Sequence, residues 1–131
     1  MGMDVIVACP EKYDPDQKVL DFAKDYKGFG LYRDPVEACA GADVIFTDVW
    51  ASMGQEQEAY ERRQVFQGIY QINEKTLAAA NPGCMVQHCL PAHRGEEITE
   101  KVFEEHADEI FDEAENRLHA QKAVLVKCMI D

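Results

Sequence analysis

The sequence is short of positive charge and contains no long hydrophobic run. Its 131 residues include 13 lysines and arginines against 25 aspartates and glutamates, a formal net charge of -12 with the histidines neutral. Nucleic-acid surfaces need clustered cations to meet phosphate groups, so we expect no nucleic-acid partner. No apolar stretch approaches the roughly 18 residues that cross a bilayer, so we expect no membrane partner either.

Cysteine spacings typical of zinc fingers or redox-active CxxC motifs are also missing. The five cysteines are odd in number and scattered: Cys9, Cys39, Cys84, Cys89 and Cys128. They fit reduced thiols in a cytoplasm, and the first residues carry neither the cationic nor the apolar region of a secretion signal. We therefore predict a cytoplasmic protein.

Glycine-rich loops for phosphate binding are absent as well. Gly28 and Gly30 lack the third glycine of a dinucleotide fingerprint and precede an expected strand rather than a helix. No Walker-type loop occurs. The sequence therefore gives no support for a nucleotide cofactor, and we predict no cofactor and no metal centre.

What the sequence does contain is an alternation of strand and helix signals. Short apolar or β-branched runs predict strands, at residues 5–8, 29–33, 43–49 and 85–90. Helices are predicted at residues 15–28, 34–41, 73–80 and 99–106, which begin at the capping residues Asp14, Asp34, Asn73 and Thr99. Residues 56–66 are mostly polar, but Glu58 and Arg62 stand at a favourable i,i+4 spacing and predict a further helix. This alternation predicts one α/β domain with a parallel sheet covered by helices on both faces.

The C-terminal part is predicted to continue with one more strand and one more helix. Glu109 to Phe111 is expected to be a brief strand, after which Asp112 and Glu115 resemble a capping box that opens the last helix. This helix presents one apolar stripe: Ala114, Leu118, Leu125 and Cys128.

Ligands of parallel α/β sheets bind beyond the carboxyl ends of the strands, which points to the loops after Val49 and Leu90. In the first loop, Asp48 could meet an ammonium group, while Ser52 and the backbone beside Gly54 serve a second polar group. The same side chains could instead tie off a turn through local hydrogen bonds. The loop alone does not decide between these interpretations.

The second loop gathers two imidazoles, a thiol and a guanidinium between His88 and Arg94. Neighbouring strand residues point to opposite faces, so His88 is badly placed to activate Cys89 as a nucleophile. Zinc is conceivable, but no further ligand pair at finger-like spacing occurs. For Cys89 alone, a buried strand thiol is the plain alternative.

Arg117 is the third candidate for chemistry. It lies in the expected last helix, offset from the apolar stripe, where a surface arginine would pair with the acidic residues around it. The alternative is an anion clamp, because a guanidinium group binds two phosphate oxygens at once.

Three segments taken together are much more specific than any one of them: DVIFTDVWASMGQE at 43–56, HCLPAHRGEE at 88–97 and FDEAENRLHAQ at 111–121. In order and approximate separation they resemble the ornithine carbamoyltransferase family. The resemblance runs from Gly2 to Met129 and covers most of that family's C-terminal, ornithine-binding domain. It implies that residues 1–131 form part of a Rossmann-like, three-layer αβα domain with a mostly parallel sheet.

The resemblance also implies an enzyme that joins L-ornithine to carbamoyl phosphate, giving L-citrulline and phosphate, as in arginine biosynthesis. By the same resemblance, Asp48 meets the side-chain amine of ornithine, while Ser52 and Met53 hold the amino-acid end. An alkylammonium group has a pKa of about 10.4 in water, so the amine must lose a proton before it can attack.

Contacts to carbamoyl phosphate are implied for three further residues. Cys89 and Leu90 lie where the two substrates meet, with the backbone of Leu90 facing the carbamoyl group, and Arg117 contacts carbamoyl phosphate. Asp48 and Cys89 are the expected catalytic residues, because they can orient the amine and handle its proton. Arg117 would stabilise the charge that develops on the departing phosphate.

The chain departs from the family pattern in two respects. The family's preceding domain, with a Ser-Thr-Arg-Thr-Arg loop and a His-Pro-x-Gln segment, has no counterpart here, and neither has the first strand-helix unit of the ornithine domain. That strand is expected mid-sheet, so its loss leaves unpaired edges and predicts a rearranged sheet or the pairing of two chains. We expect a homo-oligomer: a dimer for this chain, where the full-length family forms trimers.

We expect the isolated chain to be inactive, because the positioning of both reactants can supply about 7–11 kcal/mol of such a barrier. A function of another class stays open, namely a non-catalytic amino-acid-binding or interaction module that reuses the fold.

Overall fold

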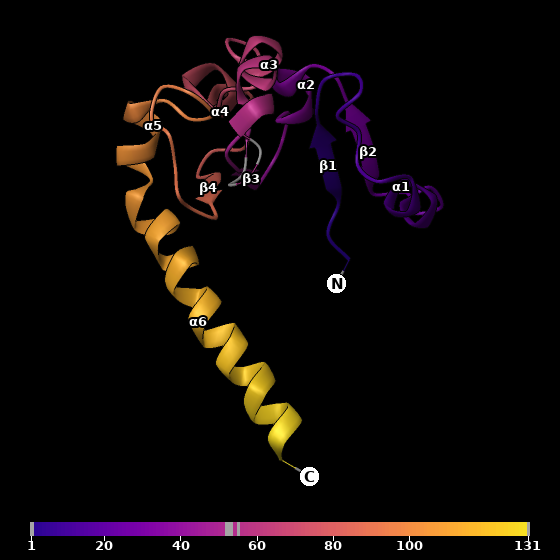
Figure 1. The fold of residues 1–131 in the computed structure, drawn as a ribbon, viewed down its shortest axis with the longest axis vertical. Coiled ribbons are helices and arrows are strands. Elements are labelled where there is room, and N and C mark those ends of the chain that lie inside the picture. Colours follow the sequence, from indigo (N-terminus) through magenta and orange to yellow (C-terminus); the bar gives the residue numbers. More distant parts are fainter. Residues whose placement is uncertain (1, 52–53, 55, 131) are drawn as a thin grey trace.

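A computed structural model describes residues 2–51, 54 and 56–130 of the chain. The elements follow one another in nearly the order expected from the sequence (Figure 1). They are β1 (Val5–Ala8), α1 (Gln17–Ala23), β2 (Phe29–Tyr32), α2 (Pro35–Ala38), β3 (Val44–Thr47), α3 (Glu56–Phe66), α4 (Glu74–Ala79), β4 (Met85–His88), α5 (Glu100–Glu105) and α6 (Ala107–Met129).

The strands form two parallel pairs. In one pair Val5 of β1 lies opposite Phe29 of β2, and in the other Thr47 of β3 lies opposite His88 of β4. Figure 1 shows β1 and β3 as the inner strands of the two pairs, and no ladder joins them within the described residues. The parallel pairing predicted from the sequence is confirmed, although two short pairs take the place of one sheet.

The inner strands carry apolar side chains that the rest of the described chain leaves exposed. Val5 and Ile6 of β1 and Val44 and Phe46 of β3 all belong to this group. Within the described residues no ladder joins β1 to β3, so each of them also has one strand edge without a partner. An open strand edge presents backbone N–H and C=O groups that another strand can pair with.

The core lies around β4, α5 and the first turns of α6. Ile98, Val102 and Ile110 are completely buried there, and Val86 of β4 is packed among them. On the other side of the molecule, α1 buries none of its residues, and its Phe22 is almost fully exposed. The part of the fold that carries β4 is therefore the well-packed part.

An aromatic cluster ties together the segments that follow three of the strands. The ring of Phe66 lies 4.9 Å from that of Tyr13 and 5.9 Å from that of Trp50, measured between centroids. Tyr70 lies 5.4 Å from the same ring, and its hydroxyl donates a 2.7 Å hydrogen bond to the carbonyl of Arg33. Because Tyr13, Arg33 and Trp50 follow β1, β2 and β3, the carboxyl ends of these strands are held together.

The short helices begin at side-chain caps, most of them at the predicted residues. Asp34 accepts a 2.8 Å hydrogen bond from the N–H of Val36, and Asn73 and Thr99 cap α4 and α5 in the same way. The expectation is wrong at Asp14, because Asp16 caps α1 instead. Asp14 forms a 2.6 Å ion pair with Arg33 and is not available as a cap.

The C-terminal prediction is wrong in one element. Residues 109–111 are not a strand but the first turn of α6, which begins directly after His106. Ile110 enters the core, and the carboxylate of Glu109 accepts a 2.8 Å hydrogen bond from the N–H of Val86. The Asp112–Glu115 capping box is therefore also wrong, since these residues lie inside a helix that has already started.

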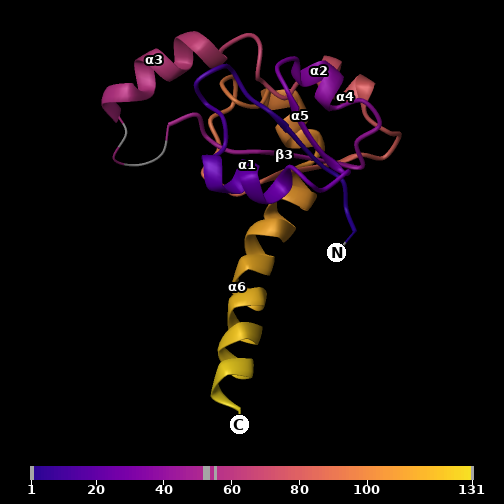
Figure 2. The ribbon, with the colours of Figure 1, turned by 90° about the vertical axis from the view of Figure 1, so that its right-hand side faces the viewer.

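The last helix extends away from the rest of the fold (Figures 1 and 2). From Glu115 to Ile130 every residue is exposed, including the predicted apolar stripe positions Leu118, Leu125 and Cys128. Among the described residues, no helix has both the length and the apolar character needed to cross a membrane.

The two ends of α6 should differ sharply in their sensitivity to truncation. Replacing the fully buried Ile110 in Ile110→Ala should lower the free energy of unfolding by about 2–5 kcal/mol, because the substitution leaves a cavity. Leu118→Ala on the same helix is the control, because Leu118 is 58% exposed and should cost about 0.5 kcal/mol or less. Urea unfolding followed by circular dichroism measures both values, and equal losses would contradict the assigned core.

Candidate functional site

The register of β3 on β4 places two predicted site residues beside each other. Thr47 pairs with His88, so the next residues, Asp48 and Cys89, leave the sheet at the same edge. Ligand atoms of Asp48, His88 and Cys89 lie within 4.8 Å of one another, and Asp48 is hydrogen-bonded to the Cys89 side chain. The acid and the thiol therefore form one pair at the carboxyl ends of the strands.

The environment of Cys89 keeps its thiol protonated at neutral pH. Burial, then the hydrogen bond and the negative charge of Asp48, and then the charge of Glu113 raise the pKa of Cys89 to about 11. A protonated thiol donates its hydrogen to Asp48 and does not serve as a thiolate nucleophile. Asp48 itself is exposed, and its Oδ1 accepts a 2.7 Å hydrogen bond from the N–H of Val49.

Leu90 holds an unusual backbone conformation next to this pair. Its φ of 53° lies in the left-handed region, which a leucine adopts only when its surroundings hold it there. The N–H of Leu90 donates a 2.9 Å hydrogen bond to Nδ1 of His88. With the N–H occupied, the carbonyl oxygen is the backbone group that Leu90 can turn toward an NH2 group of a bound molecule.

His88 and Glu97 form a fully buried pair that the sequence analysis did not single out. Nε2 of His88 lies 3.0 Å from Oε1 of Glu97, and the N–H of His93 donates a 2.5 Å hydrogen bond to the same oxygen. Because Nδ1 of His88 accepts from Leu90, the ring proton belongs on Nε2, facing Glu97. Burial opposes the ionisation of Glu97, but the hydrogen bonds from His88 and His93 outweigh it and lower its pKa.

No periodicity in the sequence links His88 to Glu97. The acid lies nine residues further on, beyond an irregular loop, and is the second of two adjacent glutamates. The available signal was chemical: a histidine predicted inside a buried strand needs a hydrogen-bond partner, and the following loop supplies an acid.

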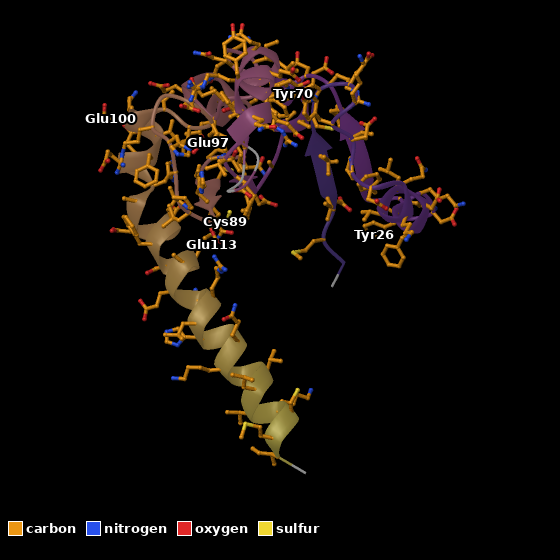
Figure 3. All side chains as sticks on the ribbon, in the orientation of Figure 1. Tyr26, Tyr70, Cys89, Glu97, Glu100 and Glu113 are labelled. Carbon is orange, nitrogen blue, oxygen red and sulfur yellow. The ribbon has the colours of Figure 1, made fainter. Side chains whose placement is uncertain are left out.

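Arg117 approaches the pair from α6. Its Nη1 lies 3.5 Å from the carbonyl oxygen of Cys89, and within the described residues it forms no ion pair. The interpretation as a surface arginine paired with neighbouring acids is therefore not what the structure shows. One turn earlier, Oε2 of Glu113 is buried without a hydrogen-bond partner in the described part of the chain. Figure 3 shows Glu113 close to Cys89.

The remaining predicted residues, Ser52 and Met53, lie outside the described residues. Trp50 stands just before them. Its carbonyl oxygen accepts a 3.2 Å hydrogen bond from Arg62, and its ring contacts the ring of Phe66. The start of this loop is thus attached to α3.

The group formed by Asp48, His88 and Cys89 is poorly suited to a metal ion, although its donor atoms are close together. Both ring nitrogens of His88 are already hydrogen-bonded, one to Leu90 and one to Glu97. The raised pKa of Cys89 also disfavours the thiolate that a metal requires. The arrangement instead offers a carboxylate, a neutral thiol, a backbone carbonyl and a guanidinium around one position.

Comparison with known proteins gives the family. The profile described as "Aspartate/ornithine carbamoyltransferase, Asp/Orn binding domain" matches residues 1–128. The chain belongs to this family.

Curated relatives and solved structures agree with this assignment. Ornithine carbamoyltransferase of Pyrococcus abyssi is 54% identical over 130 residues, covering 95% of this chain and 41% of the relative. A Pyrococcus furiosus relative named "Ornithine carbamoyltransferase, anabolic" is 52% identical over 134 residues, covering 98% of this chain and 42% of the relative. The chain thus spans about two-fifths of the length of these relatives.

The fold of this family domain is supported by a crystal structure of anabolic ornithine carbamoyltransferase from Campylobacter jejuni. It superposes with a TM-score of 0.87 at 39% identity, covering 93% of this chain and 42% of that one. The predicted α/β, Rossmann-like fold class is therefore confirmed.

The contact between Asp48 and Cys89 predicts how the thiol ionises. In Asp48→Asn the negative charge is lost, so the pKa of Cys89 should fall below its value of about 11, and the thiol should be alkylated faster at moderately alkaline pH. Iodoacetamide labelling over a pH series, followed by peptide mass spectrometry, measures this, with the exposed Cys128 as internal reference. An unchanged profile for Cys89 would show that Asp48 does not hold its proton.

Proposed function

We propose that residues 1–131 act as the ornithine-binding domain of an ornithine carbamoyltransferase. In this reaction the side-chain amine of L-ornithine attacks carbamoyl phosphate, giving L-citrulline and phosphate. The observation that carries the proposal is the contact between Asp48 and Cys89 at the carboxyl ends of β3 and β4, with Leu90 and Arg117 beside them. The family match supports the choice of reaction.

Asp48 and Cys89 have different roles in this proposal. The exposed carboxylate of Asp48 meets the ornithine ammonium group and accepts from it, which orients the amine. Cys89, protonated at neutral pH, contributes a hydrogen-bond donor and an uncharged surface, so it does not compete for the proton of the amine. Ser52 and Met53 hold the amino-acid end of ornithine, as the family resemblance implies.

Leu90 and Arg117 act on the other substrate. The carbonyl of Leu90 accepts a hydrogen bond from the carbamoyl NH2, and the buried His88–Glu97 pair fixes that carbonyl through the N–H of Leu90. Arg117 binds carbamoyl phosphate and stabilises the negative charge that develops as phosphate departs. A guanidinium with no ion pair in the described chain is free to do this.

We infer that the 131 residues by themselves do not catalyse the reaction. Arg117 is the cationic group that contacts this pair, through the carbonyl of Cys89, and one guanidinium is fewer donors than a phosphate needs to be positioned. The name of the Pyrococcus furiosus relative supports a biosynthetic direction, toward arginine. We place the reaction in the cytoplasm.

Catalysis should appear only when a carbamoyl-phosphate-binding half is supplied. The chain mixed with both substrates should give no citrulline above background, whereas addition of the separately produced remainder of a relative should restore turnover. In this assay Asp48→Asn should lower the rate by about 10²- to 10⁴-fold, the range for a group that handles a proton. Cys89→Ala should also lower it, and Cys128→Ala, at an exposed position, is the matched control.

Two outcomes of this assay would contradict the proposal. Turnover by the chain alone, abolished in Cys89→Ala, would show that no second half is needed. Absence of activity with the second half, together with tight binding of an unrelated amino acid in titration calorimetry, would favour a non-catalytic binding module.

We also propose that this chain associates with a second copy through the open inner edges of β1 and β3. Light scattering after size-exclusion chromatography should give about twice the chain mass of 14.8 kDa. A charge on an edge opposes strand pairing, so Val5→Lys on the inner strand β1 should give monomers, whereas Leu31→Lys on β2 should not. A wild-type chain that is monomeric would rule out this association.

A further inference from the structure

The loop between β4 and α5 holds a second cluster of donor atoms, separate from the Asp48–Cys89 pair. Ligand atoms of His93, Glu96 and Glu97 lie within 4.8 Å of one another. All three belong to one short stretch that begins just after Leu90 and Pro91. Figure 3 labels Glu97, above Cys89 in that view.

Glu97 is the residue that points to a ligand here. Its side chain is completely buried, and Oε1 already accepts hydrogen bonds from His88 and from the N–H of His93. Oε2 is buried too, yet it has no hydrogen-bond partner among the described residues. Nδ1 of His93 lies 3.8 Å from this oxygen, too far for a hydrogen bond. A buried, ionised oxygen without a partner needs an electropositive neighbour.

The donor set matches the preferences of divalent transition metals. One imidazole nitrogen with carboxylate oxygens is a common ligand combination for Zn²⁺ and its neighbours in the series. Ligand atoms around tetrahedral zinc are about 3.4 Å apart, so the cluster needs only a small closure. His93 can supply it, because its side chain is 54% exposed and free to rotate.

The surroundings of the cluster also suit a metal ion. His88 donates to Glu97 from behind, as residues next to a ligating carboxylate usually do, and this fixes the direction of Oε2. On the other side, a cavity of about 230 Å³ bordered by Trp50, Arg63, His93 and Glu96 leaves room for water ligands. Arg63 on α3 is ion-paired with Glu96 and holds that carboxylate at the edge of the cavity.

We propose that Nδ1 of His93 and Oε2 of Glu97, together with a carboxylate oxygen of Glu96, bind one divalent transition-metal ion such as Zn²⁺. The ion links the exposed side chain of His93 to the buried side chain of Glu97, both in the loop that follows Leu90. It does not contact Asp48 or Cys89, and the proposal does not depend on the proposed reaction. Because the ion binds only the folded loop, it stabilises the chain by an amount that grows with the logarithm of the metal concentration once that concentration exceeds the Kd.

The test uses Cys89→Ala as background, so that no thiol at the other site competes for the metal. Zn²⁺ titration by calorimetry and Co²⁺ titration by visible absorption should both give one site per chain. His93→Ala in this background should weaken binding by at least about 10- to 100-fold, since even the loss of a group behind a ligand has this effect. His119→Ala should leave binding unchanged. It is a matched control, because His119 is an exposed histidine that also faces a glutamate, Glu115 at 3.0 Å.

The remaining outcomes would overturn the proposal. These are the absence of binding in the Cys89→Ala background, or binding that His93→Ala does not weaken. A thiolate-to-cobalt charge-transfer band in the wild type, lost together with all binding in Cys89→Ala, would place the metal at the thiol instead. Glu97→Gln breaks the buried pair with His88 and can unfold the loop, so Glu96→Gln, at a half-buried position, is the second variant and should also weaken binding.

Discussion

The site depends on the in-register parallel pairing of β3 with β4. Thr47 lies opposite His88, so Asp48 and Cys89 emerge at one edge, and a shift by a single residue would separate them and reverse which side chains enter the core. The pairing is held from the side of β4, where Val86 is fully buried and α6 packs on the strand. The relative position of Asp48 and Cys89 is thus set by the best-packed part of the fold, although Asp48 itself is exposed.

A second constraint acts behind the site. The buried His88–Glu97 pair holds the N–H of Leu90 from one side and the N–H of His93 from the other. The irregular loop after β4 is therefore attached to the strand by two backbone hydrogen bonds that end on a single hydrogen-bonded pair. Such a network is costly when only partly satisfied, and the unsatisfied position is Oε2 of Glu97, which has no hydrogen-bond partner among the residues that the structure describes. The position of Leu90 and the proposed metal site are two consequences of this arrangement.

The sequence could predict the elements better than their contacts. The apolar runs at β3 and β4 and the caps Asp34, Asn73 and Thr99 are local signals, and the structure confirms them. The adjacent apolar pair Ile110–Phe111 suggested a strand, but helical continuation through Ala114 decides the local structure. The position of Arg117 beside Cys89 depends on the residue at which α6 begins, which the sequence analysis placed too late. The His88–Glu97 pair depends on the conformation of an irregular loop, which a periodic sequence pattern does not predict.

The exposed surfaces of the fold bear on the proposal that this chain alone does not catalyse the reaction. From Glu115 onward α6 has no cover, and a helical segment of this length is only marginally stable in water without tertiary contacts. The inner edges of β1 and β3 are likewise uncovered, and Asp48 and Arg117 are open to solvent. Carbamoyl transfer to an amine requires that water be kept from the carbamoyl group, because water would compete as a nucleophile. In the reaction proposed for this chain, the open acid and the open guanidinium are therefore only part of what the chemistry needs, and further phosphate donors and a covering surface are the groups that the proposal requires in addition.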